Sequence, residues 1–196
     1  AGWPQDMVDK YFFKPVGSNF GWQYEQHANV ITPNGDVMCF DNHHYGCKQV
    51  ERDAKNLAAK DNYSRGVRYR INTEDMTIEQ VWEYGKDRGA EFFSPYICNV
   101  EYYNEGHYMI HSGGIAYDKD GAPSEALGAF VKDLGGTCRS ITVEVCDGKV
   151  MLDLEVPGNY YRAEKLKLYS DGINLELGKG QILGAMVHTK EFETDI

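Results

Sequence analysis

Short runs of alternating apolar and polar residues, separated by turn residues, follow one another along most of this chain. Residues 66–72 show the pattern plainly, because Val67, Tyr69 and Ile71 alternate with Arg68 and Arg70, and a period of two is typical of a half-buried strand. Turn residues recur at intervals of roughly eight to twelve residues. This pattern predicts an all-β chain that folds as a sandwich, a barrel or part of a propeller, with a short helix over residues 4–11.

Several antiparallel hairpins are predicted along the chain. One joins residues 29–32 to 37–41 through Asn34-Gly35, a dipeptide that favours tight hairpin turns. Others join 66–72 to 78–84, 97–103 to 108–116 and 140–146 to 149–156. Further strands are expected at 162–169 and within 180–192, and a helical turn within 50–59. Residues 27–84 and 97–156 thus form two similar four-stranded units, which suggests propeller blades.

Composition excludes several classes of partner. The chain has 196 residues and a formal net charge of −10, and an acidic protein repels the phosphates of nucleic acids. It has no run of about 18 apolar residues, so no membrane-spanning helix is expected. Five cysteines occur without a CxxC pair, which argues against a zinc ribbon. A disulfide and free buried thiols are both compatible with this pattern.

Five of the six histidines lie at the ends of predicted strands, next to turn residues. They are His27, His43, His44, His107 and His111. An imidazole titrates near neutral pH, so such groups can act as nucleophiles, proton carriers or metal ligands. The hairpin at 29–41 brings the ends of its two strands together. We therefore expect His27 and at least one of His43 and His44 to face a common anion site.

A set of motifs resembles those of the bacterial arylsulfate sulfotransferases. The motifs are Trp22-Gln-Tyr-Glu-Gln-His27, Asn34-Gly-Asp36, Phe40-Asp-Asn42, Tyr63-Ser-Arg65, Val81-Trp-Glu-Tyr-Gly85 and Ser94-Pro95. Their order and approximate spacing agree with the family over most of residues 20–115. Beyond about residue 120 the likeness rests on the strand pattern alone.

This resemblance implies a six-bladed β-propeller preceded by a small β-sandwich. Residues 1–196 would then be the C-terminal portion of the propeller catalytic domain, with the sandwich and the upstream blades outside this chain. It also implies transfer of a sulfuryl group from an aryl sulfate ester to a phenol, with no nucleotide donor and no cofactor, in the periplasm or outside a bacterial cell. Because an incomplete propeller exposes sheet edges, we expect a second polypeptide to supply the missing blades. The complete unit could also form a homo-oligomer.

The resemblance further implies a sulfated histidine intermediate. Carried over position by position, His111 best matches the nucleophile, and His27 matches another family histidine. Both are predicted to be catalytic. Small residues follow His111 at Ser112-Gly113-Gly114, and we expect them to allow close approach of the substrate. A covalent intermediate of this kind splits one transfer into two and predicts ping-pong kinetics.

The family also implies donors that hold the sulfuryl oxygens, since fixed donors stabilise charge in the transition state. The family arginine that follows Phe-Asp-Asn is absent, and His43 and His44 stand there instead. We therefore predict that His43, His44 and Asn42 bind the sulfuryl group. Arg65 is a further candidate for the missing cation.

Two other functions are compatible with these residues. The five histidines could converge on zinc or a redox metal, although no His-x-His or His-Glu-x-x-His spacing occurs, and no metal ligands are predicted. Alternatively the chain could be a non-catalytic propeller module that binds a partner through one face, which the missing arginine would favour.

Overall fold

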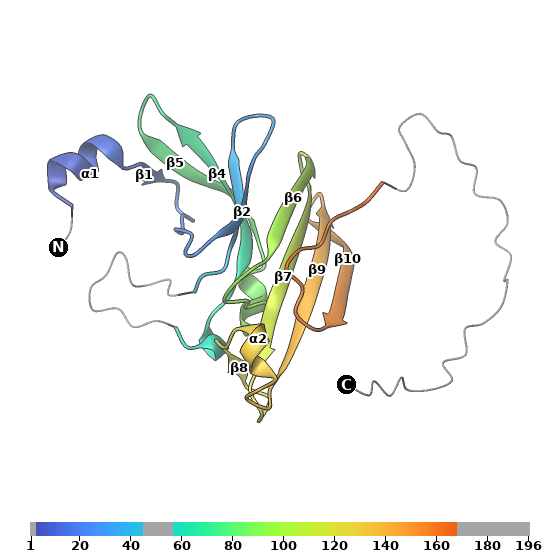
Figure 1. The fold of residues 1–196 in the computed structure, drawn as a ribbon. Helices are drawn as coiled ribbons and strands as arrows, with labels where there is room; N and C mark the ends of the chain where they lie inside the picture. Colours follow the sequence, from blue (N-terminus) through green and yellow to red (C-terminus); the bar gives the residue numbers. More distant parts are fainter. Residues whose placement is uncertain (1–2, 45–56, 168–196) are drawn as a thin grey trace, which may run out of the picture. The chain divides into compact units, whose positions relative to one another are not determined.

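The computed structural model of the protein describes residues 3–44 and 57–167. The chain divides into two compact units, residues 1–164 and 165–196, and the elements named below all lie in the first. This unit is mostly β, with two five-stranded sheets and a few short helices (Figure 1). The predicted all-β class is confirmed at this level.

The first sheet has the strand order β1-β5-β4-β3-β2. Its strands are β1 (Lys14–Val16), β2 (His27–Ile31), β3 (Val37–Asp41), β4 (Arg65–Asn72) and β5 (Thr77–Tyr84). Strands β2 to β5 pair antiparallel in chain order, so the predicted unit at residues 27–84 is confirmed. Strand β1 adds to β5 in parallel, which the sequence pattern did not indicate.

The second sheet has the strand order β10-β9-β7-β6. Its strands are β6 (Asn99–Asn104), β7 (His107–Tyr117), β9 (Thr137–Cys146) and β10 (Lys149–Pro157), and the short β8 (Pro123–Ser124) pairs with β7. This sheet matches the predicted unit at residues 97–156. The two hairpin turns at 104–106 and 147–148 lie where the sequence places them.

Helical segments are short. They are α1 (Gln5–Tyr11), η1 (Ala59–Asp61), η2 (Lys86–Glu91) and α2 (Gly128–Val131). The helix predicted over residues 4–11 is confirmed by α1, while most of the turn predicted within 50–59 lies outside the described residues. Within residues 3–44 and 57–167, no helix has the length and apolar character needed to cross a membrane.

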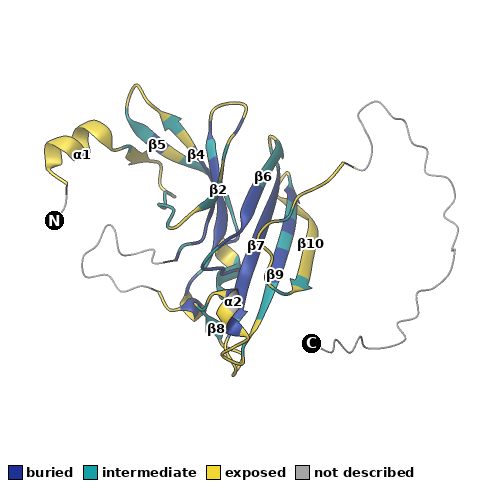
Figure 2. Cartoon of the chain, viewed as in Figure 1, coloured by how far each residue is buried: buried dark blue, intermediate teal, exposed yellow. Residues whose placement is uncertain are grey.

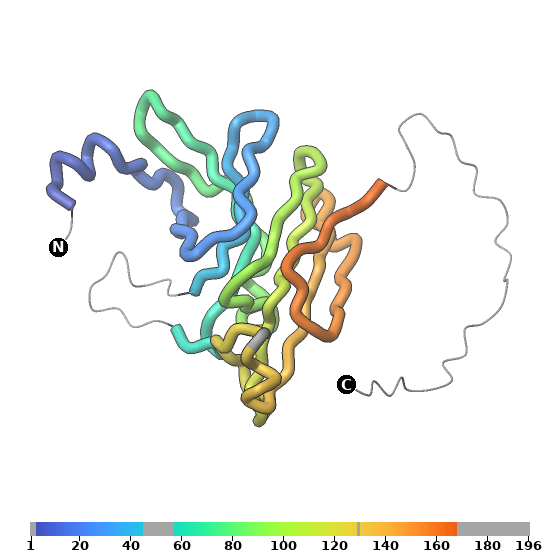
Figure 3. Tube along the Cα trace, viewed as in Figure 1, coloured from blue at the N-terminus to red at the C-terminus, as the bar shows by residue number. Residues whose placement is uncertain are grey.

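The strand predicted at 162–169 is wrong for its described part, because residues 162–167 form no strand. The chain instead crosses β7 after β10 and runs to β6 (Figure 3), where Cys98 N donates to Tyr161 O. The side-chain amide of Asn99 then makes both hydrogen bonds to the backbone of Ala163, at 2.8 and 3.0 Å. The side chain of Asn99 thus makes the hydrogen bonds that a neighbouring strand would otherwise make here. The strands expected within 180–192 lie outside the described residues.

The main hydrophobic core lies between the two sheets. Met38 and Phe40 of β3 pack with Ile110 of β7, Val143 of β9 and Phe92, and all five are buried. Strand β7 is coloured as buried along most of its length in Figure 2. Gly66 of β4 permits this close packing, since a Cβ there would lie 3.0 Å from Ile110 Cγ1. Strands β2 and β6 also contact each other across the same boundary (Figure 1).

We expect Ile110→Ala to lower the free energy of unfolding by about 2–5 kcal/mol, because it leaves a cavity at the centre of this core. Ile31→Ala is the matched control, since Ile31 is 70% exposed and should change stability by less than about 0.5 kcal/mol. Urea unfolding followed by tryptophan fluorescence measures both. Equal losses would show that the space between the sheets is not the core.

Candidate active site around His27

The open end of the β2–β3 hairpin brings His27 and Asn42 together. His27 is the first residue of β2 and pairs with Phe40, and Asn42 directly follows β3. His27 Nδ1 lies 2.7 Å from Asn42 Oδ1. The ring is half-buried, and its Nε2 makes no hydrogen bond to any residue in the described part of the chain. Of the predicted site residues, these two are in direct side-chain contact.

The amide of Asn42 is fully buried and is used by the protein itself. Its Nδ2 donates to Ser94 O at 2.8 Å and to Ile97 O at 3.1 Å. Its backbone carbonyl accepts from Ser64 Oγ at 2.9 Å. Asn42 was expected to bind substrate, but its polar atoms face protein groups. The structure therefore gives it contacts that orient His27.

The loop beneath Asn42 has an unusual backbone. Ile97 and Cys98 have φ angles of 55° and 95°, and positive φ is uncommon for a β-branched residue. Ser94 Oγ accepts from Gly114 N at 2.9 Å and Cys98 Sγ lies 3.3 Å from Gly113 N, so β7 anchors the loop. Burial raises the pKa of the Cys98 thiol to about 12. That thiol is neutral and acts as part of the packing.

His43 lies in an aromatic contact beside this pair. Its ring stacks on Tyr63, with centroids 4.1 Å apart, and meets Tyr24 edge-on at 5.4 Å. Its Nδ1 lies 2.9 Å from Asn62 Oδ1, and Asn62 Nδ2 donates to His43 O. His43 is thus fixed by an asparagine in the same manner as His27. An aryl group could stack on rings of this kind.

His44 lies between two carboxylates. Its Nδ1 is 3.3 Å from Glu25 Oε2, and its Nε2 is 4.0 Å from Glu125 Oε2. Negative groups on both sides oppose binding of a sulfate ester, which is itself anionic. The expectation that His44 holds sulfuryl oxygens stays a prediction, and these contacts count against it.

Arg65 is 1% exposed, and its guanidinium is occupied by the protein. It bonds Asp41 at 2.9 Å and Glu83 at 2.5 Å, and its Nη2 donates to the carbonyls of Gly21 and Trp22. Burial alone would lower the pKa of Arg65. The negative charge of Asp41 acts in the opposite direction, and the pKa lies above its usual value. Every N–H group of this side chain has a protein acceptor. Arg65 therefore stabilises the fold beneath the site, and its predicted contact with substrate has no free donor.

His111 lies inside β7, in the interior of the second sheet, and not at a strand end as the sequence suggested. It is 2% exposed, its Nδ1 is 2.9 Å from Thr142 Oγ1, and its Nε2 is 3.0 Å from Tyr160 O. A Cβ at residue 113 would collide with Tyr160 O, so Gly113 makes room for the chain itself, where a substrate was expected. Both ring nitrogens are occupied. The nucleophile role predicted for His111 remains untested, and this environment does not favour it.

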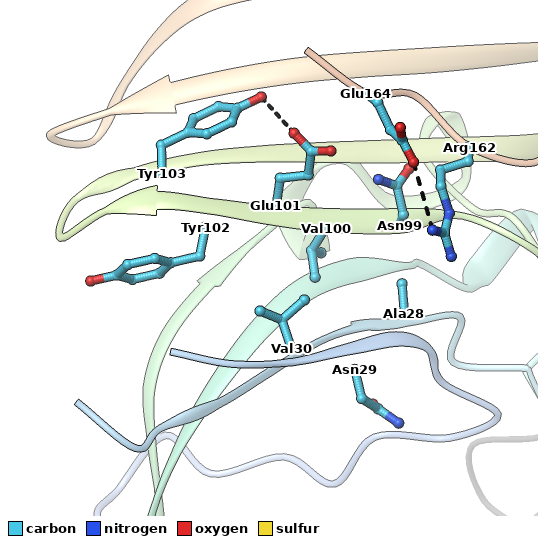
Figure 4. Close-up of a pocket in the computed structure, with 10 residues that line it drawn as sticks. All are labelled: Ala28, Asn29, Val30, Asn99, Val100, Glu101, Tyr102, Tyr103, Arg162 and Glu164. Atoms are coloured by element: carbon cyan, nitrogen blue, oxygen red, sulfur yellow. Dashed lines mark hydrogen bonds and ion pairs between the residues drawn. The ribbon is translucent and has the colours of Figure 1, made fainter. Parts of the chain in front are cut away.

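A groove of about 370 Å³ opens between the edges of β2 and β6, starting one residue after His27 (Figure 4). Its lining residues are Ala28, Asn29, Val30, Asn99, Val100, Glu101, Tyr102, Tyr103, Arg162 and Glu164. In it Tyr103 donates to Glu101 at 2.8 Å, and Arg162 lies 3.7 Å from Glu164. None of the predicted site residues lines this groove. The groove shares strand β2 with His27, but its lining contains two glutamates and one arginine and is therefore acidic.

The histidines of the described residues form no metal centre. His107 Nε2 pairs with Glu144 Oε1 at 2.6 Å on the second sheet, far along the chain from His27. Within residues 3–44 and 57–167, no group of three or more His, Cys, Asp or Glu side chains is arranged to hold a metal ion. Cys39, Cys98, Cys138 and Cys146 are free thiols there, and Cys47 lies outside those residues.

The sequence did not predict the residues that hold His43 or that hold Asn42 beneath His27. These are Asn62, Ser64, Ser94 and the backbone of Ile97. Two of them lie in motifs that carry the resemblance, Tyr63-Ser-Arg65 and Ser94-Pro95. The signal was therefore present as a motif, but nothing in it showed that these positions meet Asn42.

Comparison with known proteins points to one family. A family model described as arylsulfotransferase (ASST) matches residues 1–165. Arylsulfate sulfotransferase AssT of Escherichia coli O6:H1 is 33% identical over 129 aligned residues, covering 58% of this chain and 21% of that protein. The protein of the same name from Lelliottia amnigena is 29% identical over 140 residues, covering 63% and 22%. The chain thus spans about a fifth of the length of these relatives.

Acidification should destabilise the protein partly through His111. Burial lowers the pKa of His111 below its ordinary value of 6.5, so the unfolded chain takes up this proton more readily than the folded chain. The stabilisation is complete above about pH 6.5 and is lost as the pH falls through the lowered folded-state value. Urea unfolding at about pH 7.5 and 5.5 should show a smaller loss for His111→Gln than for the wild type. An equal loss in both would mean that His111 titrates normally in the fold.

Proposed function

This chain belongs to the arylsulfotransferase family, and from that membership we propose that it is part of an enzyme that moves a sulfuryl group from an aryl sulfate ester to a phenol. The relatives that it matches carry the name arylsulfate sulfotransferase. Since the chain spans about a fifth of their length, the proposal concerns the complete enzyme to which these residues contribute. No nucleotide donor takes part.

We propose His27 as the nucleophile, on one observation that separates it from His111. One ring nitrogen of His27 is held at 2.7 Å by Asn42, and the other has no hydrogen-bond partner among the described residues. The two nitrogens of His111 both have partners inside the core. A nucleophile needs a lone pair that a substrate can reach, together with a fixed ring. His27 meets both needs.

The reaction would proceed in two displacements. The Nε2 lone pair of His27 attacks sulfur, the N–S bond forms, and the S–O bond to the aryl group breaks with its electrons leaving on the phenolate. The acceptor phenol then attacks the same sulfur, the N–S bond breaks, and the phenol proton passes to a base. Two half-reactions that share one enzyme intermediate give ping-pong kinetics. His43 is the neighbouring imidazole that could take the proton.

Incubation of the complete enzyme with an aryl sulfate and no acceptor should place one sulfuryl group on the peptide that contains His27. Gentle mass spectrometry locates it. We expect His27→Gln to abolish the adduct and to lower turnover by roughly a hundredfold or more. His111→Gln is the matched control and should retain the adduct. An adduct on the peptide of His111 would restore the assignment that the sequence suggested, and sequential kinetics with no adduct would remove the covalent mechanism.

We further propose that the two sheets are neighbouring blades of a β-propeller. Each has four antiparallel strands in chain order, and their first strands, β2 and β6, lie against each other. Propellers repeat such sheets around an axis and usually need four to eight. Outer strand β10 leaves apolar side chains exposed, among them Met151 at 65% and Leu154 at 47%. Further blades, supplied by a second polypeptide or by more of the same one, would cover such surfaces.

The active unit should therefore be larger than this 22.2 kDa chain. Native mass measurement of the protein from its source, together with an aryl sulfate assay on each fraction, tests this. Leu152→Ser combined with Leu154→Ser should weaken the larger assembly. A monodisperse 22.2 kDa monomer with full activity would refute the proposal. A periplasmic or secreted location is part of the same proposal, and fractionation of the source cells tests it.

A further inference from the structure

We propose that the stacked rings of His43 and Tyr63 form the subsite that binds the acceptor phenol, and that Asn62 fixes His43 so that its Nε2 takes the phenol proton. The inference rests on the proposed transfer of a sulfuryl group to a phenol. It holds whichever histidine carries that group. It gives the acceptor a place in the fold and gives a buried asparagine the selection of the basic nitrogen.

Three aromatic rings meet just beyond the end of β3. The rings of His43 and Tyr63 are stacked, with centroids 4.1 Å apart and an angle of 23° between their planes. Tyr24 meets His43 edge-on, at 5.4 Å and 86°. All three residues are half-buried, so part of the cluster is accessible. Aromatic rings pair by offset stacking or by edge-on contact, and an accessible cluster of this kind suits an aryl group.

Two backbone groups fix the orientation of the Asn62 amide. Its Oδ1 accepts from Tyr63 N at 2.9 Å, and its Nδ2 donates to His43 O at 3.2 Å. A backbone N–H can only donate and a carbonyl can only accept. Exchanging the two amide atoms would leave both contacts unpaired in a residue that is 2% exposed, where unpaired polar groups are costly. Oδ1 is therefore the atom that faces the His43 ring.

This orientation fixes the hydrogen on His43. Its Nδ1 lies 2.9 Å from Asn62 Oδ1, and an amide oxygen only accepts, so Nδ1 must carry the hydrogen. In a neutral imidazole the other nitrogen then holds the lone pair. Within residues 3–44 and 57–167, Nε2 of His43 makes no hydrogen bond. The nitrogen that can accept a proton is thus the one that this part of the protein leaves without a partner.

The backbone of His43 is held in an uncommon conformation. Its φ angle is 54°, a region that few residues other than glycine occupy. Its N–H donates to Asp41 Oδ1 at 2.9 Å and to Tyr24 O at 3.1 Å. Backbone strain of this kind is found at functional sites, where the surrounding contacts impose it. His43 is therefore fixed through both its backbone and its ring, as a group that must meet a substrate atom requires.

The groups around the stacked pair suit a phenol that becomes negative as it loses its proton. Lys86 Nζ lies 5.6 Å from the centroid of the Tyr63 ring, and Arg65 Cζ lies 5.9 Å from it. Cations at such positions stabilise charge that develops on an oxygen. Burial raises the pKa of Tyr63, so its own hydroxyl stays protonated. His43 is therefore the base in this cluster.

In the proposed step the phenol oxygen attacks sulfur, and the new O–S bond replaces the bond from sulfur to the histidine that carried the group. The electrons of the broken bond return to that histidine. The phenol proton moves to Nε2 of His43, which becomes an imidazolium with hydrogen on both nitrogens. Asn62 Oδ1 then accepts from a charged donor, and such a hydrogen bond is stronger than one from a neutral ring. Loss of the proton to water restores the base.

Nitrogen NMR of the full chain, labelled with ¹⁵N at histidine, tests the selection of the nitrogen without an activity assay. Above the titration range we expect the hydrogen of His43 on Nδ1, with the signals assigned by His43→Gln. Asn62→Ala should give a mixture of tautomers. Asn72→Ala is the matched control, because Asn72 ends β4 and is exposed. Hydrogen on Nε2 in the wild type, or an unchanged tautomer in a folded Asn62→Ala protein, would overturn the role of Asn62.

Two acceptors of different acidity test the base in the complete enzyme, with para-nitrophenyl sulfate as the donor. Phenol is protonated at neutral pH and needs a base, whereas pentafluorophenol is already ionised. We expect His43→Gln to lower kcat/KM roughly 100- to 10,000-fold for phenol and less than about tenfold for pentafluorophenol. Equal losses with the two acceptors, or no loss, would overturn the role of His43. A wild-type enzyme that transfers to neither acceptor would instead refute the proposed function.

Variants of Tyr63 test the aryl subsite. Tyr63→Leu removes the stacked ring and should raise the KM for phenol roughly 2- to 10-fold, while Tyr63→Phe keeps the ring and should change it by less than about twofold. Tyr161→Leu is the matched control, because Tyr161 is 62% exposed, and it should leave the KM in place. An unchanged KM in a folded Tyr63→Leu enzyme would show that the acceptor binds elsewhere.

Discussion

The buried ion pair between Arg65 and Asp41 ties together parts of the molecule that the sequence keeps apart. Both side chains are almost inaccessible to solvent, and their atoms are 2.9 Å apart across β4 and β3. Arg65 also binds the carbonyls of Gly21 and Trp22, while Asp41 accepts from the backbone N–H of Tyr24. Removing one partner from a pair of this kind costs about 3–5 kcal/mol, because the other charge is left buried. The segment that leads into His27 is therefore held by electrostatics.

The candidate site directly follows this ion pair along the chain. Asp41 is followed by Asn42, whose amide orients His27, and Asp41 also accepts from the backbone N–H of His43. The end of β3 therefore supplies the buried carboxylate of Asp41, the buried amide of Asn42 and the half-buried ring of His43. Rigid supports of this kind are what a reacting group needs, since small errors in position cost rate. The second sheet contributes through the loop at residues 94–98, which supplies the carbonyls beneath Asn42.

The two histidines that the resemblance singled out have different environments for a simple reason. His27 begins an edge strand that pairs only with β3, so one side of its ring remains open. His111 lies in β7, which pairs with β6 and β9, and the chain after β10 crosses over it through Tyr160. Burial of an imidazole favours its neutral form and consumes its hydrogen-bonding groups. The small residues that follow His111 in the sequence did not reveal that its ring is enclosed by the chain.

The sequence by itself determined strands β2 to β7, β9 and β10, their hairpins and their grouping into two sheets, because alternation and turn residues act over a few neighbouring positions. It did not indicate the parallel strand β1, and it predicted a strand at 162–169 whose described part, 162–167, does not form. It also placed His27 and Asn42 at one hairpin end, since the Asn34-Gly35 turn sets the register. Only the tertiary structure decided which groups are free to react. Asn42 meets Ser94 and Ile97 across more than fifty residues, and His111 meets Tyr160 across forty-nine. Such contacts depend on how the sheets pack, and local patterns carry no information about them.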